Sequence, residues 1–292
     1  MIAVDGIILV ISCQKHLLTR LKEINLKENY GNWKVINVIG DLFLDCDYKL
    51  EGNLMTIKCE DSYLHLFKKE VLTFKYLYEM FDIKEGILKC NDDLEFNENC
   101  LEVFLKSSKK HKINDNEYID IDYMGRSSNG RSMINHNFTC EPDKSCDDLC
   151  LVDYYKAHQE DLNNHHHNLK DVDIAKYKKR PYTPTAIHGP FMYLSNKSCK
   201  ILINHMSNNN YNIYHYDNIT DSYPYTLEDC AISFILLSNN INLIHQNNWH
   251  KEMIGSTAYE VFNGGGADIC GNIKDSPNCI AFHTNKYKYN KM

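Results

Sequence analysis

The sequence predicts an α/β protein with a central, mostly parallel, twisted sheet flanked by helices, and with long loops in the middle of the chain. Short apolar segments of strand length alternate with amphipathic segments over the first 110 residues. Strand–helix–strand units of this kind favour parallel pairing of their strands. The length of 292 residues also fits one large domain that buries its own core.

The first elements follow from short apolar runs. Residues 6–12 and 33–39 are apolar runs of strand length, and the amphipathic stretch 14–26 lies between them. Residues 55–58 form a further short strand candidate. The order of these segments is that of a strand–helix–strand unit.

The strongest helical pattern in the chain starts near residue 61. Its apolar side chains recur at spacings of three and four: Leu64, Phe67, Val71, Phe74, Tyr78 and Phe81. Asp61 or Ser62 is the expected N-cap. Lys68 and Lys69 fall opposite the apolar stripe, so we expect them on a solvated face. A short apolar strand, 86–90, follows the helix and ends at Asn91.

The second half of the chain contains a polar stretch and then a return of ordered patterns. Residues 111–180 predict long loops and short elements, and we expect the run of three histidines at 165–167 to be solvated. Strands are then predicted at 190–194 and 241–245, and helices at 195–206 and 227–238. This divides the single domain into 1–110, a loop-rich connection at 111–180, and 181–292.

Composition excludes several classes of protein. The net charge is −7, from 32 basic and 39 acidic residues, which disfavours a nucleic-acid-binding protein. No apolar run approaches the length of a membrane span, and no basic segment precedes the first strand as in a signal peptide. We therefore expect a soluble, cytoplasmic protein. The cysteines form no C-x-x-C pair, so a structural zinc site is not expected.

An acidic turn follows the strand at 86–90. Asn91, Asp92 and Asp93 stand at its end, and carboxylates at the end of a parallel strand occupy the crevice where α/β proteins bind ligands. A hard divalent ion such as Mg²⁺ or Mn²⁺ uses a few carboxylates together with phosphate oxygens. Adjacent acids are also common in ordinary turns, so both interpretations stay open at this point.

Four motifs follow one another along the chain: the segment 59–70 (CEDSYLHLFKKE), the triplet at 91–93, the small-residue segment 188–195 (HGPFMYLS), and the Glu-Asp pair that opens 227–234 (LEDCAISF). In this order they resemble the galactosyltransferase-like and fringe-like enzymes of glycosyltransferase family 31, which have the GT-A fold. The resemblance covers roughly residues 55–245. This sequence departs from the family pattern at two positions, with Asn91 opening the triplet and Pro190 replacing a glycine.

The resemblance implies a GT-A-like domain and an inverting, metal-dependent transfer of a sugar from a UDP-sugar to a glycan or glycoprotein hydroxyl. It places the nucleotide-sugar in the half 1–110, with contacts from Asp61, Asn91, Asp92 and Asp93. It gives Mn²⁺ or Mg²⁺ two ligands, Asp93 and His283, and makes Asp229 the catalytic base with Glu228 next in line. The acceptor then binds the half 181–292. Homo-oligomer formation stays open.

Other interpretations of the same residues remain. Acids in the first turn of a helix also serve as plain N-terminal caps, which is the alternative for Glu228 and Asp229. Trp249 is either a sugar-stacking residue or a core residue, and Arg126 and Arg131 are diphosphate contacts or ordinary arginines. We interpret the three glycines at 264–266 as a flexible turn. The rival functions are a non-catalytic nucleotide-sugar or glycan-binding protein of the same fold, and a metal-dependent phosphohydrolase.

Overall fold

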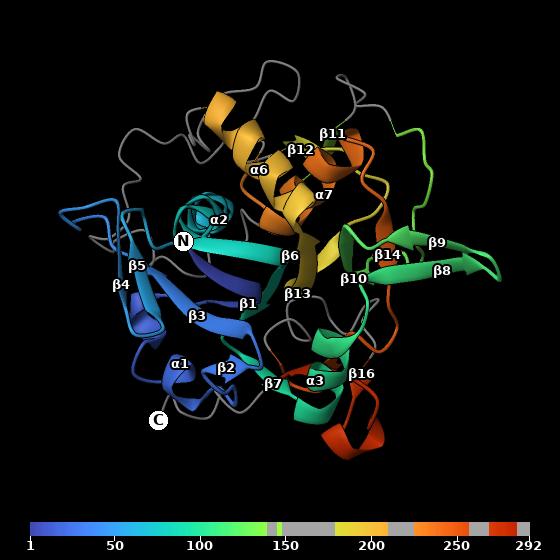
Figure 1. Cartoon of the computed structure of the whole chain (residues 1–292), viewed down its shortest axis with the longest axis horizontal. Helices are drawn as coiled ribbons and strands as arrows, with labels where there is room; N and C mark the ends of the chain where they lie inside the picture. The colour runs from blue at the N-terminus through green and yellow to red at the C-terminus, as the bar shows by residue number, and fades with distance from the viewer. Residues whose placement is uncertain (139–144, 148–178, 210–224, 257–268, 285–292) are drawn as a thin grey trace.

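A nine-stranded mixed sheet runs through the centre of the protein (Figure 1). The computed structural model describes residues 1–138, 145–147, 179–209, 225–256 and 269–284. The central strands of the sheet are β1 (Ile2–Ile11), β3 (Trp33–Gly40), β5 (Leu54–Ile57) and β6 (Phe81–Asn91). All three pairings among them are parallel, in the spatial order β5-β3-β1-β6.

The two ends of the sheet add antiparallel strands. Next to β6 lie β13 (Ile187–Ser195), β10 (Tyr123–Ser127) and β14 (Leu243–His245), and β13 runs antiparallel to both of its neighbours. At the other end, β4 (Tyr48–Glu51) and β2 (Asn29–Tyr30) pair antiparallel with β5 and β3. The predicted α/β class is confirmed, with more antiparallel pairing than the sequence predicts. Strands from both halves of the chain share this one sheet.

Helices cover one face of the sheet. They are α2 (Leu66–Met80), α6 (Asn196–Asn208) and α7 (Glu228–Ser238), which lie together on one side in Figure 1. Their apolar side chains and those of the sheet form one core, which contains Phe67, Phe74, Leu202 and Ile232. The three predicted helices are therefore confirmed. The expected N-cap of the first, Asp61 or Ser62, is wrong, because α2 begins at Leu66 with His65 at the N-cap position. The side chain of Ser195 caps α6 by accepting from the Ser198 amide.

The opposite face is covered by shorter elements. They are α1 (Arg20–Glu23), α3 (Glu98–Lys106) and a four-stranded sheet of β7 (Leu94–Phe96), β17 (Ala281–His283), β15 (His250–Met253) and β16 (Ile269–Cys270). Leu21, Leu101 and Phe96 contribute to the second core on this face. The amphipathic stretch 14–26 forms only the 3-10 turn η1 (Gln14–His16) and the short α1, so the expected long helix is wrong there.

The remaining described elements lie away from the centre. A hairpin of β8 (Lys110–Asn114) and β9 (Glu117–Asp120) projects from the main body in Figure 1. A two-stranded antiparallel sheet pairs β11 (Ser145–Asp147) with β12 (Lys179–Pro181), and the 3-10 turn η3 spans Ile273–Asp275. Within the described part of the chain, no helix is both long and apolar enough to cross a membrane. The histidine run at 165–167 and the glycines at 264–266 lie outside the described residues.

Candidate functional site

The candidate site lies at the topological switch point of the sheet, where the chain stops adding strands on one side of β1 and adds the next strand on the other side. From β1 the chain adds β3 and β5 on one side, and then crosses through α2 to place β6 on the other side. A crevice opens outside the carboxyl ends of the strands at such a switch point, and α/β proteins bind ligands there. Ser12, directly after β1, donates from Oγ to Asp92 Oδ2 at 2.7 Å and so links the residues that follow the paired ends of β1 and β6.

The acidic triplet stands at this position. Asn91 is the last residue of β6, while Asp92 and Asp93 form the turn into β7. Arg20 of α1 lies beside both carboxylates, with Nη1 3.4 Å from Asp92 Oδ1 and 3.2 Å from Asp93 Oδ2. His283, at the end of β17, places Nε2 2.9 Å from Asp93 Oδ2. The structure therefore brings together the two residues predicted to bind a metal, Asp93 and His283.

The pairing of strands explains this meeting of distant residues. In the small sheet β17 runs antiparallel to β7, and His283 pairs in register with Leu94, directly after Asp93. The next amide, that of Thr284, donates to the Asp93 carbonyl at 3.0 Å. The backbone therefore sets the His283 side chain beside the Asp93 carboxylate.

The charges of the site influence one another strongly. Burial, with the neighbouring Asp93, raises the pKa of Asp92 to about 6. Burial also acts to raise the pKa of Asp93, but the charges of His283 and Arg20 outweigh it and hold that pKa below the ordinary value. Burial opposes charge on His283, yet its two carboxylate neighbours, Asp93 and Glu252, hold its pKa well above the ordinary value.

These residues fit a divalent cation that shares its ligands with a substrate. Among the described residues, no three His, Cys, Asp or Glu side chains form a group that could hold a metal ion by themselves. Asp93 Oδ1, however, is buried without a hydrogen-bond partner in the described structure, and His283 Nε2 lies near Asp93 without hydrogen-bond geometry. Mg²⁺ sites with one or two protein ligands completed by substrate phosphates have this character.

Asp61 lies at the same end of the sheet, and its two oxygens are engaged by this chain. Oδ2 accepts from the Gln14 amide at 2.7 Å, and Oδ1 accepts from the Gly40 amide at 3.1 Å and from Lys69 Nζ at 2.7 Å. Asp61 therefore joins the ends of β1 and β3 to α2. These contacts shape the crevice, and its predicted contact with a nucleotide stays a prediction.

The expected solvated positions of Lys68 and Lys69 need correction. Lys69 is only 2% exposed and donates from Nζ to the Ser12 carbonyl at 2.6 Å as well as to Asp61. Lys68 is half-buried and donates to Glu60 Oε2 at 2.8 Å. The prediction failed because the loop before α2 folds back over the helix and supplies acidic partners to its polar side.

The predicted base, Asp229, lies in the first turn of α7 and is partly buried. Its Oδ1 accepts from the Cys230 amide at 2.7 Å. Burial, with the adjacent Glu228, raises the pKa of Asp229 to about 6. A carboxylate with a pKa near neutrality suits general-base chemistry better than an ordinary aspartate does.

Glu228 links α7 to the strand of the triplet. Its Oε1 accepts from Lys89 Nζ at 2.7 Å, and Lys89 lies on β6 two residues before Asn91. A side-chain carbon on Gly189 of β13 would lie 2.6 Å from the same oxygen, so any larger residue there would displace the Glu228 carboxylate. Since β13 is antiparallel to β6, Gly189 lies beyond the carboxyl end of β6. The start of α7 therefore lies at the same end of the sheet as the triplet.

The other side chains considered for the site are one tryptophan and two arginines. Trp249 is fully buried, stacks on Phe191 and donates from Nε1 to the Phe191 carbonyl at 2.8 Å, so it is a core residue. Arg126 is buried within β10, and Arg131 is exposed.

The sequence interpretation missed several residues of the site. Ser12 follows the first apolar run directly, so its position at a strand end was a usable signal. Arg20 lies within the stretch expected to form a long helix, and nothing local marks it as a partner of the triplet. Glu252 and His250 belong to the small sheet, whose pairing has no signal in the sequence.

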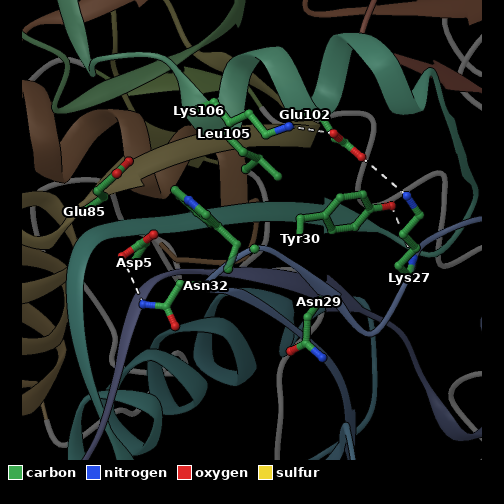
Figure 2. A pocket seen from close by; sticks show the side chains of 11 residues that line it. Asp5, Lys27, Asn29, Tyr30, Asn32, Glu85, Glu102, Leu105 and Lys106 are labelled. Atoms are coloured by element: carbon green, nitrogen blue, oxygen red, sulfur yellow. Dashed lines mark hydrogen bonds and ion pairs between the residues drawn. The ribbon is translucent and has the colours of Figure 1, made fainter.

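A pocket of about 500 Å³ lies elsewhere, near the amino end of β1 (Figure 2). Its lining includes Asp5, Tyr30 and Trp33. The charged side chains around it pair with one another: Lys106 with Glu102 at 2.8 Å, and Lys27 with Glu102 at 3.4 Å. Asn32 donates to Asp5 at 3.0 Å. Since these groups satisfy one another, the pocket shows no chemistry of its own.

Comparison with solved structures finds distant matches at low structural similarity. The chain is similar to the apo form of mouse xyloside xylosyltransferase 1, at 8% sequence identity over 98% of each chain and a TM-score of 0.39. No protein-family model matches the sequence, and no curated protein matches it. The resemblance to family 31 therefore rests on the four motifs alone, and the function is inferred from the site.

Proposed function

We propose that this protein is a metal-dependent glycosyltransferase that moves a sugar from a UDP-sugar to a hydroxyl of a glycan or glycoprotein acceptor. The observation that carries the proposal is the meeting of Asp93 and His283 at the switch point between β1 and β6, with a buried Asp93 oxygen left without a described partner. The order of the four motifs supports the same function, and the resemblance implies inversion at the anomeric carbon.

Asp93 and His283 would hold the Mn²⁺ or Mg²⁺ ion. When bound with the donor, such an ion stabilises the charge that builds up on the departing diphosphate. Arg20, already beside Asp92 and Asp93, adds a positive charge on the same side. Two protein ligands leave coordination positions for diphosphate oxygens, as this role requires.

Asp229 would act on the acceptor. One of its oxygens is held by the Cys230 amide, which leaves Oδ2 to take the proton of the attacking hydroxyl. The raised pKa of Asp229, about 6, makes that proton transfer more favourable than it is for an ordinary aspartate. The buried pair of Glu228 with Lys89 holds the start of α7 in place.

Turnover of a panel of UDP-sugars by the full chain, with Mn²⁺ and with a chelator, tests the proposal. We expect Mn²⁺-dependent release of UDP and of free or transferred sugar, and loss of that release in Asp93→Asn. The exposed variant Asp275→Asn is the matched control and should retain activity.

The products separate the rival functions. Release of UMP and a sugar phosphate would mean cleavage of the phosphoanhydride bond and identify a phosphohydrolase. Metal-dependent binding of a UDP-sugar without turnover, in the presence of a range of glycan acceptors, would identify a non-catalytic binding protein. Either result would contradict the proposed transferase.

A further inference from the structure

Glu252 stands directly beside the predicted metal ligand His283. In the small sheet β15 runs parallel to β17, and Glu252 pairs in register with His283. The same sheet continues to β7, which begins directly after Asp93. Backbone pairing therefore arranges Glu252, His283 and Leu94 in a row across three strands, with Asp93 directly before Leu94.

The Glu252 carboxylate is buried, and one of its two oxygens is hydrogen-bonded. It is 3% exposed, and its Oε2 lies 2.8 Å from His283 Nδ1 and accepts from Ser256 Oγ at 3.0 Å. The other oxygen, Oε1, lies 3.6 Å from Nε2 of the buried His250. Burying a carboxylate is costly unless partners compensate the lost water. The protein therefore keeps a carboxylate at this position although its burial costs folding free energy.

The contact with Glu252 uses one of the two ring nitrogens of His283, Nδ1. Because Nδ1 donates to Glu252, Nε2 is the nitrogen that faces Asp93, 2.9 Å from Oδ2. These two atoms lack hydrogen-bond geometry, and Asp93 Oδ1 has no hydrogen-bond partner among the described residues. A histidine that ligates a metal commonly donates its other ring N–H to a carboxylate, which fixes the orientation of the ring.

We propose that Glu252 is a positioning residue that holds the His283 ring through Nδ1, so that Nε2 and the Asp93 carboxylate face one cation-binding point. The inference rests on the proposed function, because it concerns the cation that accompanies the diphosphate. It adds a carboxylate that contacts neither the substrate nor the cation.

Three substitutions at Glu252 separate the effect of side-chain length from the effect of the carboxylate charge. Glu252→Gln keeps the length of the side chain and an acceptor oxygen but loses the charge. Glu252→Asp keeps the charge but withdraws the carboxylate by one methylene, and Glu252→Ala removes both. Lys251→Ala is the matched control, because alternate side chains of a strand point to opposite faces. Thermal melting of each variant reports whether it folds.

Mn²⁺ affinity in the presence of UDP, followed by the spin-resonance signal of free Mn²⁺, is the first measurement. We expect Glu252→Ala and Glu252→Asp to bind Mn²⁺ about 10–100-fold more weakly than the unchanged protein. Glu252→Gln should retain most of the affinity, and Lys251→Ala all of it. If Glu252→Ala does not fold, Glu252→Asp decides.

The second measurement needs no metal. Proton NMR of the metal-free protein should show a slowly exchanging Nδ1 proton of His283, assigned by its absence in His283→Gln and lost in Glu252→Asp. Absence of that proton from the unchanged protein would overturn the positioning role. Equal Mn²⁺ affinity of the unchanged protein and Glu252→Asp would overturn it while leaving the metal site in place. No Mn²⁺ binding by the unchanged protein would overturn the proposed function as well.

Discussion

Asp229 illustrates how surroundings change the chemistry of a single side chain. Its place in the first turn of α7 would suit a simple capping role, because free amides there stabilise a negative charge. Burial and the adjacent Glu228 act in the opposite direction and raise its pKa to about 6. A carboxylate with a raised pKa holds a proton more readily, which is the property a general base needs.

Replacing Asp229 tests that role. Asp229→Asn should lower kcat by about a hundred- to ten-thousand-fold, while affinity for the UDP-sugar changes little, because the proton is removed only in the transition state. The amide oxygen can still accept from the Cys230 N–H, so the melting temperature should hold. A variant that keeps most of its transferase activity would move the base elsewhere, with Glu228 next in line.

The pH dependence of kcat gives a second readout of the same residue. The base must be ionised, and its pKa in the folded protein is about 6. Activity should therefore be constant above this pH and should fall by about tenfold per pH unit below it. A flat profile across this range would contradict the assignment of Asp229 as the base.

In helix α2 the sequence pattern predicts the apolar face correctly, but it does not predict the burial of the polar face. The apolar stripe through Phe67, Val71 and Phe74 packs on the sheet as predicted. The polar side is also largely buried, because the loop before the helix brings Asp61 against Lys69. Periodicity identifies the face that packs on a sheet, but it does not show what covers the other face.

Replacing Lys69 tests this burial. Lys69→Met should reduce the free energy of unfolding by about 3–5 kcal/mol, because it leaves the Asp61 carboxylate buried without its cation. Lys84→Met is the control, since Lys84 pairs with Asp82 at an exposed position of β6, and we expect a loss under about 1 kcal/mol. Urea unfolding of the two variants measures both values, and equal losses would contradict the buried pair.

At the scale of the whole molecule, one buried cluster joins the helical layer to the sheet. Lys89 of β6 lies 3.0 Å from Glu70 of α2 and 2.7 Å from Glu228 of α7, and it donates to the Gly189 carbonyl of β13 at 2.6 Å. Burial, with the nearby charge of Glu228, raises the pKa of Glu70 to about 8 even though Lys89 opposes the shift. At neutral pH Glu70 therefore stays protonated, and one carboxylate faces one lysine.

This cluster predicts a loss of stability with rising pH. The folded protein retains the Glu70 proton up to about pH 8, whereas the unfolded chain releases it near the ordinary value of 4.5. The folded state binds more protons in this window, so the free energy of unfolding should fall as pH rises from about 4.5 to about 8. Glu70→Gln imitates the protonated form and should flatten this dependence.

Urea unfolding at both ends of the window measures the effect. Glu79→Gln, at an exposed position of the same helix, is the control and should keep the slope of the unchanged protein. If Glu70→Gln keeps the full slope too, Glu70 does not hold its proton in the folded protein.

The sequence alone determined the α/β class, the positions of the main strands along the chain, and the presence of the helices α2, α6 and α7, although it placed the start of α2 about five residues too early. These depend on local patterns of apolar residues, which act between near neighbours in the chain. The same local signals located the triplet at a strand end and the acidic pair at a helix start. They also predicted a long helix at 14–26, where the structure has only short turns.

Only the tertiary structure decided which of these residues meet. His283 reaches Asp93, and Glu252 reaches His283, through the pairing of three short strands far apart in the chain. Lys69 is buried because a loop supplies Asp61, and Lys89 is buried between Glu70 of α2 and Glu228 of α7. The pairing of distant strands and the compensation of buried charge depend on contacts over long sequence separations, and no local pattern encodes them.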